Sequence, residues 1–228
     1  MLLTVCLLAA VVFVATFVYS SFFEWTLHRY IMHDDRFMRY PHRAHQLEHH
    51  DIFKADATYC LSKELHDAEA EKHLTFAWWN APLLIALHVP IFAAIATPAY
   101  FFADWTGAIT ALVAALVGMG SYYALYEYVH FCMHVPANRA LERTKFFQFI
   151  NNHHRLHHIH YKKNLNVVIP IADFCLGTMV KLEDPELFNK LEAVRRRRAQ
   201  RKEATAAAAM EAEMHDSSEA KQAKAGVI

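Results

Sequence analysis

The sequence has no excess charge of either sign, few cysteines, and little glycine or proline. Lys plus Arg and Asp plus Glu number 23 each, so we expect no nucleic-acid partner. The four cysteines are too few and too scattered for a disulfide framework, and the absence of a CxxC pair excludes a zinc ribbon and a thioredoxin-like motif. Five glycines and seven prolines exclude collagen-like and low-complexity chains. The 228 residues are instead 55% hydrophobic and include 17 histidines, and their number predicts one domain or two.

Long apolar runs predict membrane-spanning segments, because a helix needs about 20 apolar residues to cross a bilayer. Residues 2–23 carry no charge. A signal peptide is the competing interpretation, but it requires a basic N-terminal region and residues 1–4 contain no base, so we predict a retained span. Two further spans are predicted at about 76–102 and 107–129. Three prolines in 76–102 allow either one kinked span or a re-entrant hairpin.

The distribution of basic residues predicts the orientation in the membrane. Arginines follow the first and third spans, whereas the connector 103–106 has none. The positive-inside rule therefore places 24–75 and 130–228 in the cytoplasm, together with every histidine cluster. We expect a first span at 1–23, a main domain at 24–180, and a charged, alanine-rich, partly disordered tail at 181–228. Within these, 62–73 and 138–161 are predicted to be helices, and 164–180 is predicted to be extended or a loop.

Ten histidines form four clusters beside the apolar runs. The clusters are His28 and His33 (HX4H); His45, His49 and His50 (HX3HH); His130 and His134 (HX3H); and His154, His157 and His158 (HX2HH). Residues three and four apart share a helix face, so the last two clusters, and the 45/49 pair, each aim their imidazoles at one point. The 28/33 pair diverges more and suits a helix end or two metals. Imidazole nitrogen is a ligand for iron, zinc, copper and nickel.

The number of clustered histidines indicates two metal ions. One tetrahedral ion uses three or four ligands, whereas ten imidazoles supply about five to each of two metals. Glu127 shares a helix face with His130 and is a candidate to accept the second N–H of a ligand imidazole. His88, inside an apolar run, is interpreted as a core histidine in preference to a cavity-lining one. Candidate residues around the ligands are Glu24, His42, Glu127, His153, His160 and Asp173.

The order of the clusters, interleaved with apolar spans, resembles the membrane-bound fatty acid hydroxylase/sterol desaturase superfamily. The stretch from Asn164 through Asp173 to Gly177–Thr178 is similar to that family's closing segment, and the resemblance covers roughly residues 24–180. It implies an all-α, multi-pass membrane protein with a cytosolic, histidine-rich helical cap, in which the ten clustered histidines bind two metals. One departure is the second cluster, HX3HH here where the hydroxylase branch favours HX2HH, which leaves the roles of His42 and His45 open.

The resemblance implies a non-haem di-iron oxygenase that hydroxylates a lipid chain from the bilayer with O2 and external electrons. Two iron ions are the expected cofactors, although zinc could occupy the site in recombinant material. The sequence contains no cytochrome b5-like domain, so the expected electron donor is separate: a ferredoxin, or cytochrome b5 with its reductase. The alternatives are a lipid or sterol desaturase, a carotenoid hydroxylase, and a non-enzymatic metal-binding membrane protein. Carotenoid hydroxylases share the HRYIMH cluster, but their third cluster is usually HX4H.

Overall fold

A computed structural model describes residues 2–55, 57–61 and 74–181 of the chain. The chain divides into two units, residues 1–181 and 182–228, and the described residues all belong to the first. The described residues form helices, turns and loops and contain no strand, which confirms the predicted all-α class for this part of the chain. The predicted helix 62–73 and the predicted tail, from residue 182 onward, lie outside the described residues.

Two helices are long and apolar enough to cross a membrane by length and composition. They are α1, Leu2–Leu27, which continues into a π-helical turn ending at Met32, and α6, Val89–His134. The run 2–23 forms a helix readily because it contains no proline, glycine or charge to interrupt it. Much of the apolar surface of α1 is exposed, including Val11 and Val14. A helix that is apolar all round and little buried in protein is suited to a lipid environment.

The predicted span 76–102 is divided between two helices. Helix α5, Asn80–Leu87, is separated from α6 by a turn at His88, and Pro90 then lies in the first turn of α6, where proline is tolerated. Helix α6 is itself broken at Ala103 and Asp104, whose backbone dihedrals are not helical. The break falls within the predicted connector 103–106. Phe92 and Ala99 before it pack with Ala111 and Ala115 after it, so the chain reverses direction there.

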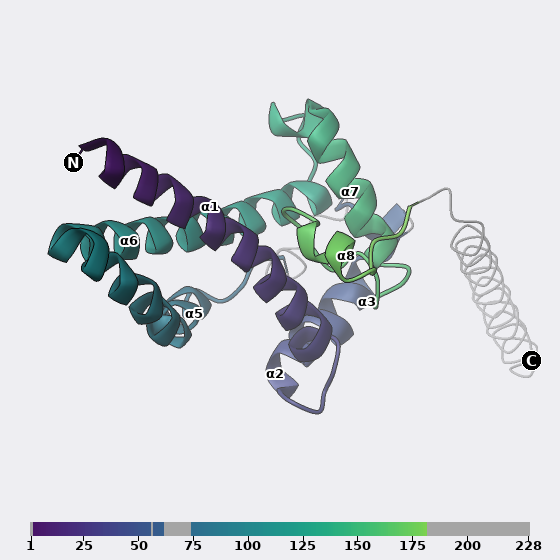
Figure 1. Ribbon diagram of the computed structural model, residues 1–228. Coiled ribbons are helices and arrows are strands. Elements are labelled where there is room, and N and C mark those ends of the chain that lie inside the picture. Colours follow the sequence, from purple (N-terminus) through teal and green to yellow (C-terminus); the bar gives the residue numbers. More distant parts are fainter. Residues whose placement is uncertain (1, 56, 62–73, 182–228) are drawn as a thin grey trace, which may run out of the picture. The chain divides into compact units, whose positions relative to one another are not determined.

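The second limb of α6 packs along α1, and both helices lead to the region of α3, α7 and α8 (Figure 1). Small side chains make this close approach feasible. A Cβ atom at Gly118 would lie 3.2 Å from Thr16 Cβ, and Val12 packs with the alanines of α6. The two helices therefore carry their C-terminal ends, and the histidines there, to the same place.

Short helices and turns carry the other histidine clusters. The N-terminal ones are the π-helical η1 (His28–Met32) and η2 (Arg43–His49), with α2 (Arg39–His42), α3 (His50–Ile52) and the 3₁₀ turn η3 (Ala57–Tyr59). The C-terminal ones are the 3₁₀ turn η4 (Leu141–Arg143), α7 (Lys145–His157) and α8 (Ile171–Cys175). The helix predicted at 138–161 is shorter than expected, because the Thr144 side chain caps α7 by accepting the N–H of Phe147.

The reversal in α6 depends on the absence of a side chain at Gly107. A Cβ atom there would lie 2.3 Å from the carbonyl oxygen of Ala99, which is backbone and cannot turn aside. Gly107→Ala is therefore expected to destabilise the protein by about 1–3 kcal/mol, the usual cost of overpacking. Thermal unfolding in detergent measures the effect. Gly120→Ala is the matched control, because its Cβ would meet no atom within 4 Å; equal melting temperatures for the two variants would contradict the prediction.

Candidate metal centre

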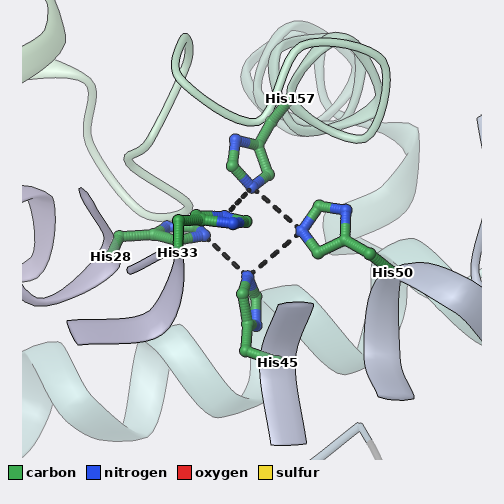
Figure 2. Close-up of side chains that lie close together, drawn as sticks. All are labelled: His28, His33, His45, His50 and His157. Atoms are coloured by element: carbon green, nitrogen blue, oxygen red, sulfur yellow. Dashed lines mark hydrogen bonds between the residues drawn. The ribbon is translucent and has the colours of Figure 1, made fainter. Parts of the chain in front are cut away.

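Nine of the ten clustered histidines converge in two adjoining groups, one of which is drawn in Figure 2. Site A contains His28, His33, His45, His50 and His157, and site B contains His49, His130, His134 and His154. Within each group the candidate ligand nitrogens lie within 4.8 Å of one another. His158 lies beside site B, because its Nε2 lies 3.0 Å from Nε2 of His154. Site A thus has five imidazoles and site B four with His158 next to them, all taken from segments far apart in the sequence.

Two π-helical turns set the positions of the first two clusters. In an α-helix, residues five apart point about 140° away from each other. In η1, however, the N–H of His33 bonds to the carbonyl of His28, and the two rings stack at 5.0 Å between centroids. In η2 the N–H of His50 bonds likewise to the carbonyl of His45, and their Nε2 atoms lie 3.2 Å apart. Of the two alternatives predicted for the HX4H pair, the helix end fits, because the pair lies where α1 and η1 end, and both rings belong to site A.

The two doublets of adjacent histidines are divided between the sites. Neighbouring residues on a helix point about 100° apart, so they cannot serve one ion together. His49 belongs to site B and His50 to site A, while His157 belongs to site A and His158 contacts site B. The predictions that the 45/49 pair, and the three histidines of the last cluster, would each aim at one point were therefore wrong. The rings of His50 and His158 lie 4.3 Å apart, so the two sites adjoin.

Main-chain carbonyls hold the outward ring nitrogens of five of the clustered histidines. Nδ1 of His28, His130, His134, His157 and His158 bonds to the carbonyl oxygen of Leu165, Leu74, Tyr59, Lys163 and Phe53, respectively. A carbonyl oxygen can only accept, so each Nδ1 carries a proton and the neutral ring presents the lone pair of Nε2 to the site. This arrangement is typical of histidine ligands, whose outward N–H fixes the tautomer and the ring orientation.

The contacts between inward nitrogens fit a bound cation. Nε2 of His33 and Nε2 of His157 lie 2.9 Å apart, while the Nδ1 atoms of these rings bond to Gln46 Oε1 and the Lys163 carbonyl. Two lone pairs at that distance repel each other unless a positive charge lies between them. Nε2 of His130 is buried and has no hydrogen-bond partner within the described part of the chain. Burying such an acceptor without a partner is costly, and a metal ion would satisfy it.

Burial keeps the imidazoles in the neutral form that binds metals. Burial lowers the pKa of His33 to about 4. It also lowers the pKa values of His45, His50, His154 and His158, and the neighbouring imidazoles lower them further. The uncharged ring is the ligating form, so these side chains need not lose a proton to bind metal at neutral pH.

Asp173 and His153 lie one layer outside the ligands. The Asp173 carboxylate contacts Nε2 of His153 at 2.9 Å and accepts the Thr178 hydroxyl at 2.6 Å, with backbone N–H groups of Leu165 and Asn166. These bonds fix residues 164–178, the loop that supplies the carbonyl to His28. Both residues are thus near the centre, as predicted, but they position the loop and do not contact the ligand rings described above.

The other candidates have different partners. Glu24 is buried and accepts hydrogen bonds from Tyr122, Asn166 and the N–H of Val167. The bonds from Asn166 and Val167 connect α1 to residues 164–178, the closing loop. Glu127 accepts the N–H of Phe76, whereas the Leu74 carbonyl orients His130 in the manner expected of Glu127.

Three further histidines lie outside the two sites. His42 is half-buried and belongs to neither group. The carbonyl of His160 accepts the N–H of Lys163 in the turn after α7. His88 is buried against Tyr19 and the Leu84 carbonyl, as a core histidine would be.

Some residues that shape the sites were missed by the sequence interpretation. Gln46 holds His33, and Asn164 adopts a positive φ of 55° while its side chain bonds to the carbonyls of His153 and Val180. The ring centroids of Tyr59 and His134 lie 4.7 Å apart, and the main-chain carbonyl of Tyr59 accepts a hydrogen bond from Nδ1 of His134. The role of Asn164 could have been recognised, because this residue begins the closing segment. No sequence pattern indicated a role for Gln46 or Tyr59.

An apolar cavity of about 100 Å³ lies beneath site A. Its walls come from α1, η1, α5, α6 and Phe76, and it extends to His28 and Glu24. The lining residues are Ser20, Phe23, Glu24, Leu27, His28, Met32, Phe76, Ala81, Leu84, Ile85, Met119, Gly120, Tyr122, Tyr123 and Tyr126. An apolar molecule in this cavity would be in contact with a candidate metal ligand.

Removing bound metal is expected to lower the melting temperature substantially. An ion that binds only the folded chain stabilises it by about 4 kcal/mol when its concentration is 1,000 times the dissociation constant. Thermal unfolding of the metal-loaded protein, with and without a chelator, measures the difference. A His134→Ala/His157→Ala variant, which lacks one ligand in each site, should show little response. Identical melting curves for the wild type in the two conditions would contradict the prediction.

Comparisons of the chain with protein-family models, curated proteins and solved structures found no match. The resemblance to the hydroxylase/desaturase superfamily therefore depends on the histidine spacing. The described residues themselves show two histidine groups that could hold metal ions, next to an apolar cavity.

Proposed function

We propose that the protein is a membrane-bound, non-haem di-iron oxygenase that hydroxylates a lipid chain. The observation that supports this most strongly is the division of the imidazoles into two adjoining groups, five in site A and four in site B with His158 beside them. A structural zinc site uses four ligands, and zinc has no redox chemistry. Five nitrogen ligands instead suit a six-coordinate metal with one position left for an outside molecule.

Two iron ions in these sites would supply O2 activation and the oxidising power to break an unactivated C–H bond, with electrons from a ferredoxin or from cytochrome b5 and its reductase. The chain itself holds and orients the ligands. Main-chain carbonyls keep five of the rings in the Nδ1–H tautomer, and Asp173 fixes the loop that carries one of these carbonyls. The apolar walls of the cavity exclude water and would hold a hydrocarbon chain beside His28.

A multi-pass arrangement would bring the ligands together at one membrane face. Helix α1 crosses once in this proposal, and α5 with the first limb of α6 crosses a second time. The reversal at Ala103 and Asp104 then returns the second limb to the starting face, where His130 lies. Exposed apolar side chains on both helices, such as Val14 and Val117, would contact lipid. The basic residues after the first and third spans support a cytoplasmic position for this face in the proposal, by the positive-inside rule.

Lipid analysis of a host that expresses the protein tests the proposal. Mass spectrometry is expected to show lipids with one added oxygen that are absent when a double variant, His134→Ala/His157→Ala, is expressed. Loss of two hydrogens in place of a gained oxygen would overturn hydroxylation in favour of desaturation. Unchanged lipids from a protein that retains its metal and receives electrons would overturn the oxygenase proposal and favour a metal-binding protein without catalysis.

A further inference from the structure

The cavity beneath site A has an inner end and an outer end. Its inner end is at His28, whose Nε2 lies 2.8 Å from that of His45 in site A. Along α1 the lining begins at Ser20, eight residues earlier, which is about 12 Å along a helix. The contact of Gly118 with Thr16 and the Tyr122–Glu24 hydrogen bond align α6 with α1. This register puts the start of the α6 lining, Met119 and Gly120, at the outer end.

Gly120 leaves that outer end open. It is exposed although it lines the cavity, and a Cβ atom built on it would meet no atom within 4 Å. Ile85 of α5, which also lines the cavity, is 42% exposed. The opening therefore lies between α5 and α6, on a surface where the exposed neighbours are apolar, including Leu116 and Val117.

We propose that Gly120 forms a lateral portal through which an unbranched hydrocarbon chain of a membrane lipid passes between the bilayer and the cavity beneath site A. The occupant follows from the surroundings, because the walls are apolar and the opening lies among lipid-facing side chains. The cavity measures only about 100 Å³, which suits a slender polymethylene chain better than a fused ring system. Passage of the chain to the metal centre rests on the proposed function, whereas its binding in the cavity does not.

A bulky residue at position 120 should close the portal with little effect on the fold. Because the added side chain of Gly120→Phe begins in open space, the variant is expected to keep the metal content of the wild type. Val117→Phe is the matched control: it adds the same ring on the same helix, at a 53% exposed position that does not line the cavity. If Gly120→Phe binds less metal than the wild type, Gly120→Leu replaces it in the same test.

Photolabelling tests the portal without any turnover. The full-length, zinc-loaded protein is placed in phosphatidylcholine nanodiscs that contain a phospholipid with a diazirine on its acyl chain, and adducts are mapped by mass spectrometry. Labelling of Tyr123 and Tyr126 is expected in the wild type and in Val117→Phe, with a fall of at least about tenfold in Gly120→Phe. Equal labelling in Gly120→Phe, no labelling of these residues in the wild type, or equally strong labelling by a diazirine sterol would overturn the proposal. If the zinc-loaded protein were labelled as expected but the iron-loaded protein, supplied with electrons, oxidised no lipid, the portal would be retained and the proposed function alone would be overturned.

Discussion

Replacing His157 with alanine is expected to abolish lipid oxidation and to remove one of the two bound metal ions. His157 is fully buried, and its Nε2 lies 2.9 Å from that of His33 and 3.2 Å from that of His50. Alanine would remove a ligand from the middle of site A and leave the Lys163 carbonyl without its imidazole partner. We expect turnover to fall by more than about 100-fold, because changes one layer further out already cost 10- to 100-fold.

Metal analysis and lipid mass spectrometry on the same preparation measure this effect. His215→Ala, which alters a histidine outside the four clusters, should keep both ions and full turnover. His153→Ala is an intermediate case, because His153 contacts Asp173 and lies outside both groups, so metal affinity should weaken without loss of the site. Two tightly bound ions and undiminished turnover in His157→Ala would contradict the assignment of His157 as a ligand.

Asp173→Asn is expected to cost about 1–3 kcal/mol of stability, the usual penalty when a buried hydrogen-bond donor loses its acceptor. The Asp173 carboxylate is fully buried and contacts His153 Nε2, the Thr178 hydroxyl and two backbone N–H groups. An amide NH2 in place of one oxygen would face one of these donors. The variant should also bind metal more weakly, because the closing loop presents the carbonyl that holds His28.

The loss in Asp173→Asn should not depend on pH between about 8 and 5. Burial raises the pKa of Asp173, but the hydrogen bonds from His153, Thr178 and Asn166 outweigh burial and hold the pKa below its ordinary value of 3.8. A carboxyl with a lowered pKa stabilises the fold above its unfolded pKa, and this contribution is lost as pH falls through the folded value. Above about pH 5 it is therefore present in full.

Chemical unfolding of the two proteins across this pH range measures the stability gap. Asp34→Asn is the control, because Asp34 makes an exposed ion pair with Arg36 and its change should leave the melting temperature unaltered. A gap that closed near pH 6, or a variant as stable as the wild type, would contradict the role given to Asp173.

The parts of the molecule that depend on short-range sequence pattern were the most predictable. The apolar run 2–23 forms α1, and the two histidines at the end of α6, four residues apart, lie in the same site. Both results follow from the helical repeat within one segment. The beginning of α7 was misplaced because a side-chain cap at Thr144 and a 3₁₀ turn compete with the helix there.

Features that depend on tertiary contacts could not be predicted from the sequence. Helical spacing of 3.6 residues puts His28 and His33 on different faces, and only the π-helical turn brings them together. The same spacing cannot show that His49 and His50 join different sites. The carbonyl of Leu74 replaces Glu127 as the partner of His130, and a main-chain group leaves no mark in the sequence.

The most direct test of the two-site arrangement is anomalous X-ray diffraction at the iron edge from crystals of the protein loaded with iron. The arrangement predicts two peaks in each chain. One should lie among His28, His33, His45, His50 and His157, and the other among His49, His130, His134, His154 and His158. A single peak shared by all ten imidazoles, or peaks outside these two groups, would contradict it.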